Sequence, residues 1–273
     1  MSYPEFQHAE QTGWDRRAAV YGATTARATT QGIPALLAAA GVAAGRRVID
    51  VCCGPGYAAG AAASIDAEAE GIDAAPAMVA AARERFPACR FEVADATALP
   101  AADGSFDAAL CSFGLFHLAD PTAAVAEMHR VLRPGGRLAV SHWCGPAVSP
   151  FFKVVFGSIA AHADMSVVPA GPPPFALSSL EALEELLAGA GLSDVTVSEV
   201  PIVFEAPADA FAEHFRDFSV RGSMILDGQT PETRGRIEAG WREGFAPFVE
   251  GGTIRVPMPA FVASGRKPGA FRL

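Results

Sequence analysis

The segment that decides the fold is the stretch RVIDVCCGPGY at residues 47–57. Its first half holds Val48, Ile49 and Val51, and this apolar run predicts a short buried strand of a parallel sheet. The run breaks at a Gly-Pro-Gly turn into the small residues 58–64, which favour a helix. Glycines at such a turn let a ligand approach the main chain, and the start of the helix offers free N–H donors.

Two ligand classes compete for this turn. Residues 54–59, together with the acid Asp73 on the next strand, fit the dinucleotide fingerprint G-x-G-x-x-A. However, a pyrophosphate needs N–H donors that Pro55 lacks, and Asp50 would add negative charge close to a bound phosphate. Burying the Asp50 carboxylate is also costly unless it has a partner. The missing N–H of Pro55 and the charge of Asp50 both suit a ligand with cationic groups and ribose hydroxyls but no phosphate. S-adenosylmethionine is such a ligand.

Four further segments predict strands in order along the chain. They lie at residues 71–78 (a strand and the start of a helix with proline in its first turn), 91–96, 105–113 and 132–140, the last after a Pro-Gly-Gly turn. The first two of these strands end in Asp73 and Asp95. Asp73 lies 23 residues after Asp50, about the spacing at which an acid accepts ribose hydroxyls.

This series of motifs resembles the class I S-adenosylmethionine-dependent methyltransferases, most closely the small-molecule group that includes the ubiquinone and menaquinone C-methyltransferases. The matching motifs cover roughly residues 45–143. The family pattern is Asp-x-Gly-x-Gly-x-Gly, whereas this chain has Asp50-x-Cys52-x-Gly54-x-Gly56. Cys52 therefore replaces the first glycine, and we expect this substitution only to adjust the loop.

The resemblance implies an α/β fold with a doubly wound, mostly parallel seven-stranded sheet, and S-adenosylmethionine as cofactor with S-adenosylhomocysteine as product. It implies that Asp73 binds the ribose hydroxyls, that Asp95 binds the adenine amino group, and that Asp50 orders the amino-acid end of the cofactor. The other implied cofactor positions are Cys52, Gly54, Gly56, Ala74, Met78, Ala96, Ser112, Phe113 and Tyr21. Asp95 is alternatively a turn residue, and Asp107 is interpreted as the closure of a turn.

Composition favours a soluble enzyme. The length of 273 residues suffices for one large α/β domain with additions, or for two small domains. The net charge of −9 argues against a nucleic-acid substrate, since phosphate binding needs a positive surface. Five cysteines without a Cys-x-x-Cys pair predict reduced thiols in the cytoplasm and no metal site. The polar N-terminus carries no signal peptide pattern, and no segment reads as a membrane span.

The chain is predicted to divide into five parts. These are an N-terminal helical cap (1–44), the S-adenosylmethionine-binding core (45–143), a completion of the sheet with a substrate-side segment (144–204), a helical lid insertion (205–252), and a last strand with a tail (253–273). Residues 8–44 predict two helices, with Trp14 and Tyr21 on one helical face. In related enzymes an N-terminal helix covers the cofactor, so Tyr21 is expected to close over the methionine end; the alternative is ordinary packing.

The last two strands of the sheet, residues 194–204 and 253–267, are predicted to pair, with the insertion between them forming two helices (208–220 and 231–249). The first of these helices carries an aromatic face that must bury against something. Either it is the lid of an apolar acceptor pocket at the carboxyl ends of the strands, which we favour, or it is an accessory helix packed on the sheet. The residues predicted to contact the acceptor are His117, Trp143, Phe175, Phe211, Phe215 and Phe218.

Methyl transfer needs mainly the alignment of a nucleophile with the sulfonium and the exclusion of water. A phenol, hydroxyl or activated carbon must also lose a proton, usually to a histidine. His117 and His142 both follow predicted strands and are the candidate bases, although each could equally be a hydrogen-bonded wall residue.

We therefore predict methyl transfer to a carbon, oxygen or nitrogen of a small apolar or aromatic metabolite. The alternatives are an NAD(P)-dependent oxidoreductase and a protein that binds S-adenosylmethionine without transferring its methyl group. The sequence predicts no oligomeric state.

Overall fold

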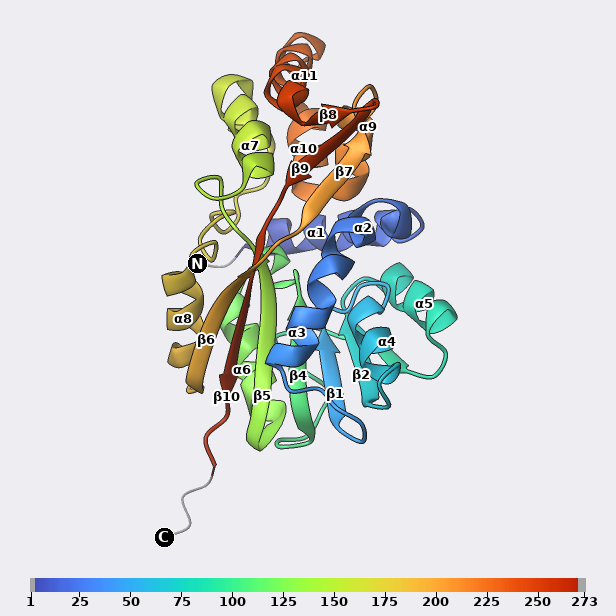
Figure 1. The fold of residues 1–273 in the computed structure, drawn as a ribbon, viewed down its shortest axis with the longest axis vertical. Helices are drawn as coiled ribbons and strands as arrows, with labels where there is room; N and C mark the ends of the chain where they lie inside the picture. Colours follow the sequence, from blue (N-terminus) through green and yellow to red (C-terminus); the bar gives the residue numbers. More distant parts are fainter. Residues whose placement is uncertain (1–2, 270–273) are drawn as a thin grey trace.

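A seven-stranded sheet forms the body of the protein in the computed structural model, which describes residues 3–269 (Figure 1). Its strand order is β3-β2-β1-β4-β5-β10-β6. The strands are β1 (Arg47–Val51), β2 (Glu68–Asp73), β3 (Arg90–Val93), β4 (Phe106–Ser112), β5 (Leu132–Trp143), β6 (Ser193–Val200) and β10 (Ala260–Arg266). The first five pair in parallel, and β10 runs antiparallel between β5 and β6. The predicted fold class is confirmed.

Helices cover both faces of this sheet because its central strands are apolar on both sides. The helices α3 (Ile33–Ala39), α4 (Tyr57–Ala63) and α5 (Pro76–Arg85) contribute to one buried cluster. The helices α6 (Pro121–Val131) and α8 (Leu180–Gly189) contribute to another. Two of these helices begin at side-chain caps, since Asp120 accepts a hydrogen bond from the amide of Ala123 and Ser179 accepts one from Ala182.

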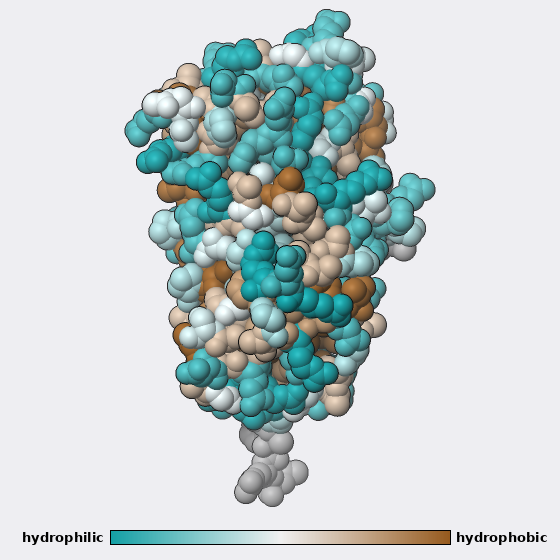
Figure 2. Space-filling view, turned by 90° about the vertical axis from the view of Figure 1, so that its right-hand side faces the viewer, coloured by the Kyte–Doolittle hydropathy of each residue, from teal (hydrophilic) through white to brown (hydrophobic). Residues whose placement is uncertain are grey.

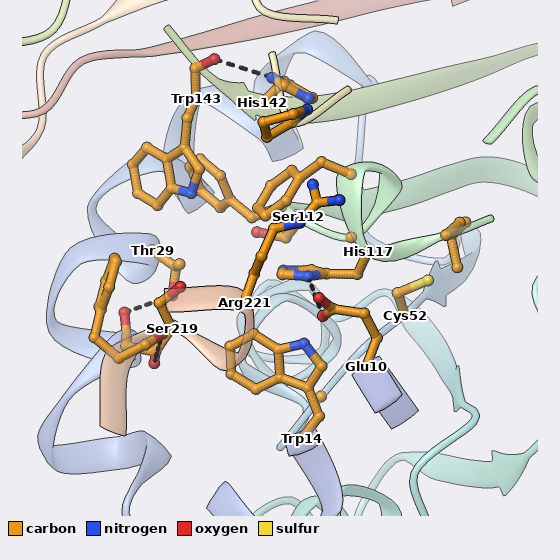
Figure 3. Close-up of a pocket in the computed structure, with 18 of the residues that line it drawn as sticks. Glu10, Trp14, Thr29, Cys52, Ser112, His117, His142, Trp143, Ser219 and Arg221 are labelled. Carbon is orange, nitrogen blue, oxygen red and sulfur yellow. Dashed lines mark hydrogen bonds and ion pairs between the residues drawn. The ribbon is translucent and has the colours of Figure 1, made fainter. Parts of the chain in front are cut away.

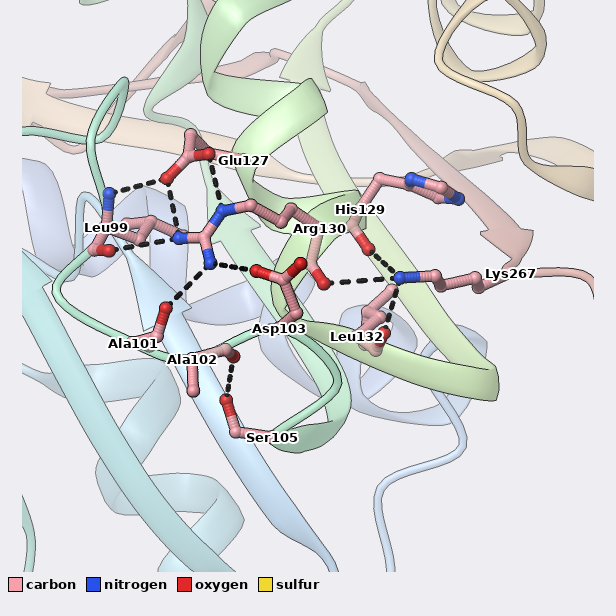
Figure 4. A network of polar contacts seen from close by, with 10 residues as sticks. All are labelled: Leu99, Ala101, Ala102, Asp103, Ser105, Glu127, His129, Arg130, Leu132 and Lys267. Carbon is pink, nitrogen blue, oxygen red and sulfur yellow. Dashed lines mark hydrogen bonds and ion pairs between the residues drawn. The ribbon is translucent and has the colours of Figure 1, made fainter.

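A polar network ties the end of β10 to helix α6, at the sheet edge opposite the carboxyl ends of the parallel strands (Figure 4). Lys267 Nζ donates hydrogen bonds to the carbonyl oxygens of His129, Arg130 and Leu132, where α6 ends. A cation at a helix C-terminus satisfies carbonyls that lack a partner within the helix. Arg130 in turn pairs with Glu127 and Asp103. These contacts hold the end of β10 against the end of helix α6.

A second, smaller unit stands beyond the carboxyl ends of the parallel strands, at the top of Figure 1. It contains a three-stranded sheet of β7 (Val203–Pro207), β9 (Thr253–Pro257) and β8 (Val249–Glu250), with the helices α7 (Pro150–His162), α9 (Phe211–Phe218), α10 (Val220–Gly228) and α11 (Pro231–Phe245). Its core is rich in aromatic rings from these elements. The insertion therefore holds three helices where two were predicted.

The predicted pairing of the last two strands is confirmed, but each of these strands is broken in two. The segment 194–204 forms β6 and then β7, and the segment 253–267 forms β9 and then β10. The breaks coincide with Pro201 and Pro259, which have no N–H to give to a ladder. One hairpin thus contributes to both sheets and links the two units.

The N-terminal prediction of two helices over residues 8–44 is wrong. Helix α1 (Pro4–Arg17) ends before Tyr21, which lies on a separate 3₁₀ turn; α2 (Thr25–Thr29) and α3 follow. The chain forms tight turns after α1, because the amides of Ala18 and Val20 donate to carbonyl oxygens three residues earlier in the sequence. Trp14 and Tyr21 do not share a helical face, yet their rings meet edge-on at 5.9 Å.

The surface shown in Figure 2 is mostly polar, with apolar side chains scattered among charged ones. Within residues 3–269, helices long and apolar enough to cross a bilayer are absent.

Candidate active site

A cavity lies at the carboxyl ends of β1, β2, β4 and β5, between the main sheet and the smaller unit (Figure 3). Cys52, Asp73, Ser112 and Trp143 lie at or directly after the ends of these strands and line it. Helix α1 covers one side, and side chains from α7, α9 and the loop after α7 complete the wall. Open α/β sheets bind ligands at this edge.

The glycine turn after β1 uses its own amide groups within the protein. Gly54 and Gly56 have positive φ angles of 52° and 82°. The amide of Gly54 donates to Asp73 Oδ2 at 2.8 Å, and the amides of Cys53 and Gly56 donate to backbone carbonyls. Pro55 has no N–H. Residues 53–56 therefore leave no amide for a pyrophosphate, which argues against the dinucleotide interpretation.

Cys52, which stands in place of the family's first glycine, has a left-handed backbone conformation with φ 58°. A side chain at this position requires room, and Gly114 on the neighbouring strand end supplies it. A Cβ atom on Gly114 would lie 2.5 Å from the Cβ of Cys52. The cysteine side chain therefore fits because the residue opposite is itself a glycine.

Two carboxyl groups lie close beneath and beside the turn. Asp73 ends β2 and accepts hydrogen bonds from the amides of Gly54 and Ala75, while burial raises its pKa. Asp50 is 1% exposed and accepts one hydrogen bond from Ala59, and its Oδ1 has no partner among the described residues. Burial, with a smaller effect of Asp73, raises the pKa of Asp50 to about 7. Negative charge at this end of the cavity favours a ligand that brings positive charge.

The structure brings most of the predicted cofactor residues to the cavity. Those that line it are Cys52, Gly54, Asp73, Ala74, Met78, Ser112, Phe113 and Tyr21. Asp50 and Gly56 lie outside the lining and support the turn from behind. Asp95 and Ala96 also lie outside it: Asp95 is exposed and accepts hydrogen bonds from the amide and hydroxyl of Thr97. Its observed contacts are those of a turn residue.

The acceptor side of the cavity is aromatic. Trp143 stacks on Phe113 with ring centroids 3.9 Å apart, and Phe175 lies opposite on the Pro-rich loop. Phe215 and Phe218 also line the cavity, but Phe215 is fully buried and packs against other rings of the smaller unit. Phe211 does not reach the cavity and contacts Trp241 and Phe245 instead. The aromatic face of α9 is thus mainly core, with one edge toward the cavity.

Helix α1 contributes four lining residues, none of which was among the predicted site residues. Gln7, Glu10, Gln11 and Trp14 follow helical spacing and therefore share one face, which was the available signal. Gln11 Nε2 donates to the carbonyl of Ala74 at 2.7 Å. The amide of Ala119 donates to Gln7 Oε1 at 2.8 Å, so α1 is held both to the end of β2 and to the loop after β4.

The two candidate histidines differ in their surroundings. His117 Nδ1 lies 2.8 Å from Oε2 of Glu10, whose side chain is 2% exposed. A carboxylate only accepts, so Nδ1 carries the proton and Nε2 keeps a free lone pair. His142 Nδ1 donates to the carbonyl of Trp143 at 2.9 Å, and burial lowers the pKa of His142 to about 4. Both rings line the cavity, but only His117 has a carboxylate behind it.

Comparison with known proteins agrees with this geometry. Residues 49–140 match the family described as methyltransferase domain. The seven-stranded sheet is the Rossmann-like fold of class I methyltransferases, and the core resembles the quinone-biosynthesis members of that class.

The chain is similar to several known proteins in sequence or in fold. A demethylmenaquinone methyltransferase of Beutenbergia cavernae is 42% identical over 117 residues, which are 43% of this chain and 49% of that protein. The chain spans about half the length of the curated relatives it matches. The YcgJ protein of Bacillus subtilis has a TM-score of 0.57 at 22% identity, covering 88% of this chain and 99% of its own.

A phosphoethanolamine N-methyltransferase of Haemonchus contortus, solved with phosphomonomethylethanolamine and S-adenosylhomocysteine, has a TM-score of 0.53 at 21% identity. The match covers 86% of this chain and 52% of that one.

Proposed function

We propose that this chain is an enzyme that transfers a methyl group from S-adenosylmethionine to a small apolar or aromatic metabolite, at carbon, oxygen or nitrogen. The observation that carries the proposal is the pair of carboxyl groups at the turn, with Asp50 buried and Asp73 half-buried, around backbone amides that are already used. This arrangement repels a pyrophosphate and favours a cation that also carries hydroxyl groups. The matched methyltransferase domain and the S-adenosylhomocysteine in a structural neighbour support the same cofactor.

The residues that would hold the cofactor fit its chemistry. Each carboxylate oxygen of Asp73 accepts one backbone hydrogen bond and has a further lone pair for a ribose hydroxyl. Cys52, Gly54 and Ser112 border the cavity near this acid, where the amino-acid end would lie. Once bound, the cofactor supplies a methyl group on a positively charged sulfur. Helix α1 would act as the cap, with Tyr21 beside Gly54.

The protein's own contribution to the reaction would be alignment, exclusion of water and removal of a proton. The aromatic walls at Trp143 and Phe175 exclude water from the acceptor. His117 Nε2 is the base, and Glu10 is the positioning residue that fixes the ring and stabilises its protonated form. His142, neutral and bonded to a carbonyl, forms part of the wall. The insertion 205–252 serves as a lid anchored by its own aromatic core.

The relatives and the composition bear on the class of acceptor and on the location of the protein. A relative named demethylmenaquinone methyltransferase supports an aromatic, quinone-like acceptor. The net charge of −9 disfavours nucleic acid as substrate. The five thiols are unpaired in the structure, which suits the reducing cytoplasm as the location.

A transfer assay tests the proposal. The protein is incubated with S-adenosylmethionine carrying a deuterated methyl group and a panel of hydroquinones, phenols and aromatic acids, and both products are followed by mass spectrometry. We expect S-adenosylhomocysteine and a labelled acceptor to form in equal amounts. Binding of the cofactor without its consumption across the panel would support the cofactor-binding protein instead.

A further inference from the structure

Arg221 is the one Lys or Arg side chain among the described residues that line the cavity. It lies in the first turn of α10, two positions after the N-cap Ser219. In Figure 3 its side chain points toward the same part of the cavity as His117. The helix N-terminus adds partial positive charge of its own beside the guanidinium. The acceptor side of the cavity thus has a positive end.

The guanidinium is held in place by contacts that do not neutralise it. It stacks over the ring of Phe6 at 4.9 Å and donates from Nη2 to the carbonyl of Pro172 at 3.1 Å. The loop fits closely around it, since a Cβ atom on Gly171 would lie 2.9 Å from Nη2. Arg221 is therefore placed by α1 on one side and by the Pro-rich loop on the other.

No carboxylate of residues 3–269 forms an ion pair with Arg221. The nearest acid that lines the same region, Glu10, is bound to His117. Partial burial lowers the pKa of Arg221, an effect that the charge of Glu10 only partly offsets, so the guanidinium carries a desolvation cost. A guanidinium has five N–H groups, and one of them is used here.

We propose that the methyl acceptor carries a carboxylate on an aromatic body, and that Arg221 binds this carboxylate. The inference rests on the proposed function and names the class of acceptor. Arg221 comes from the insertion, next to Phe215 and Phe218, whereas the predicted cofactor positions come mostly from the ends of β1, β2 and β4. A planar guanidinium binds carboxylates through two parallel hydrogen bonds, which would orient the ring between the aromatic walls.

The test compares acids with their neutral amides. Titration calorimetry measures 2-naphthoate, indole-3-acetate and 9-anthroate, each against its primary amide, on protein saturated with S-adenosylhomocysteine. The proteins are wild type, Arg221→Gln, Arg221→Lys, and the matched control Arg236→Gln, whose side chain is exposed on α11 of the same insertion. The affinity for S-adenosylhomocysteine and the melting temperature are recorded for each protein.

We expect wild type and Arg236→Gln to bind at least one acid about tenfold more tightly than its amide. Arg221→Gln should abolish this preference, and Arg221→Lys should keep part of it. The inference is wrong if no acid is preferred by wild type, or if the preference survives in Arg221→Gln. A loss of S-adenosylhomocysteine affinity in Arg221→Gln would overturn it too, because Arg221 would then bind the cofactor's own carboxylate. Absence of S-adenosylhomocysteine binding to wild type would instead overturn the proposed function itself, and this inference with it.

Discussion

Glu10 accepts a hydrogen bond from Nδ1 of His117 at 2.8 Å, although the two residues lie 107 positions apart in the sequence. The contact joins the N-terminal helix to the loop after β4, and it places a buried carboxylate behind a ring that borders the cavity. The second ring nitrogen makes no hydrogen bond to the described residues. The arrangement is that of a base held in one tautomer and one orientation.

Glu10→Gln should lower kcat by at least about tenfold, because the amide can still orient His117 but no longer stabilises the protonated ring. His117→Asn should lower kcat by roughly 10²–10⁴-fold, the range for a lost general base. The affinity for S-adenosylhomocysteine should stay unchanged in both. Glu5→Gln, an exposed acid on the same helix, is the control. Full activity in both His117→Asn and Glu10→Gln would show that the reaction uses no base here.

Asp73→Asn should weaken S-adenosylhomocysteine binding by about 1–3 kcal/mol, because a ribose hydroxyl loses a charged acceptor. Asparagine can accept a hydrogen bond from only one of the two amides, those of Gly54 and Ala75, so a melting curve is recorded to check that the fold persists. Glu70→Gln on the same strand, paired with Arg47 away from the cavity, is the matched control. If calorimetry gives equal affinities for Asp73→Asn and wild type, Asp73 has no role in binding the ribose.

Asp50→Asn should flatten the pH dependence of stability of the ligand-free protein. The pKa of Asp50 is raised to about 7 in the folded state, above its ordinary value of 3.8. Between these two values the folded protein holds a proton that the unfolded chain has lost, so the stability due to Asp50 declines as pH rises through this window.

Melting curves of both proteins at pH 5 and pH 8 check this prediction. The melting temperature of wild type should fall more from pH 5 to pH 8 than that of Asp50→Asn does. The buried His142 acts in the opposite direction, since its lowered pKa costs stability at acid pH, but this contribution is common to both proteins and cancels in the comparison. Equal losses would mean that Asp50 titrates near its ordinary value.

Phe215→Ala should destabilise the protein by roughly 3–5 kcal/mol, because it empties a fully buried position in the core of the smaller unit. Phe175→Ala, on the partly exposed Pro-rich loop, should cost little stability and instead raise KM or change the acceptors used. One melting curve and one acceptor panel separate the two variants. An unaltered melting temperature for Phe215→Ala with a changed acceptor profile would show that Phe215 contacts the acceptor and does not fill the core.

The features that were predicted correctly are those that depend on residues close together along the chain. The apolar run of β1, the turn at residues 54–56 and Asp73 at the end of β2 follow from local patterns, and they lie where predicted. The long hairpin was also predicted, but its division between two sheets was not, because prolines can end a strand or merely mark an edge.

Glu10 and Arg221 were not predicted, because their roles arise from contacts between distant segments. Glu10 is one acid on a polar helix, and only the docking of α1 against the loop after β4 brings it to His117. In the sequence Arg221 has the pattern of an ordinary surface cation. Only the folded structure shows its contacts with the Pro-rich loop and with Phe6. Phe211 shows the converse: its helical spacing was correct, but spacing alone cannot separate the core from the cavity wall.

Titration calorimetry of the purified protein with S-adenosylhomocysteine and, separately, with NADH tests the central claim most directly. The two carboxyl groups, Asp50 and Asp73, and the internally bonded turn predict that S-adenosylhomocysteine binds at one site per chain and that NADH does not bind. Tight binding of NADH with no detectable affinity for S-adenosylhomocysteine would contradict the account.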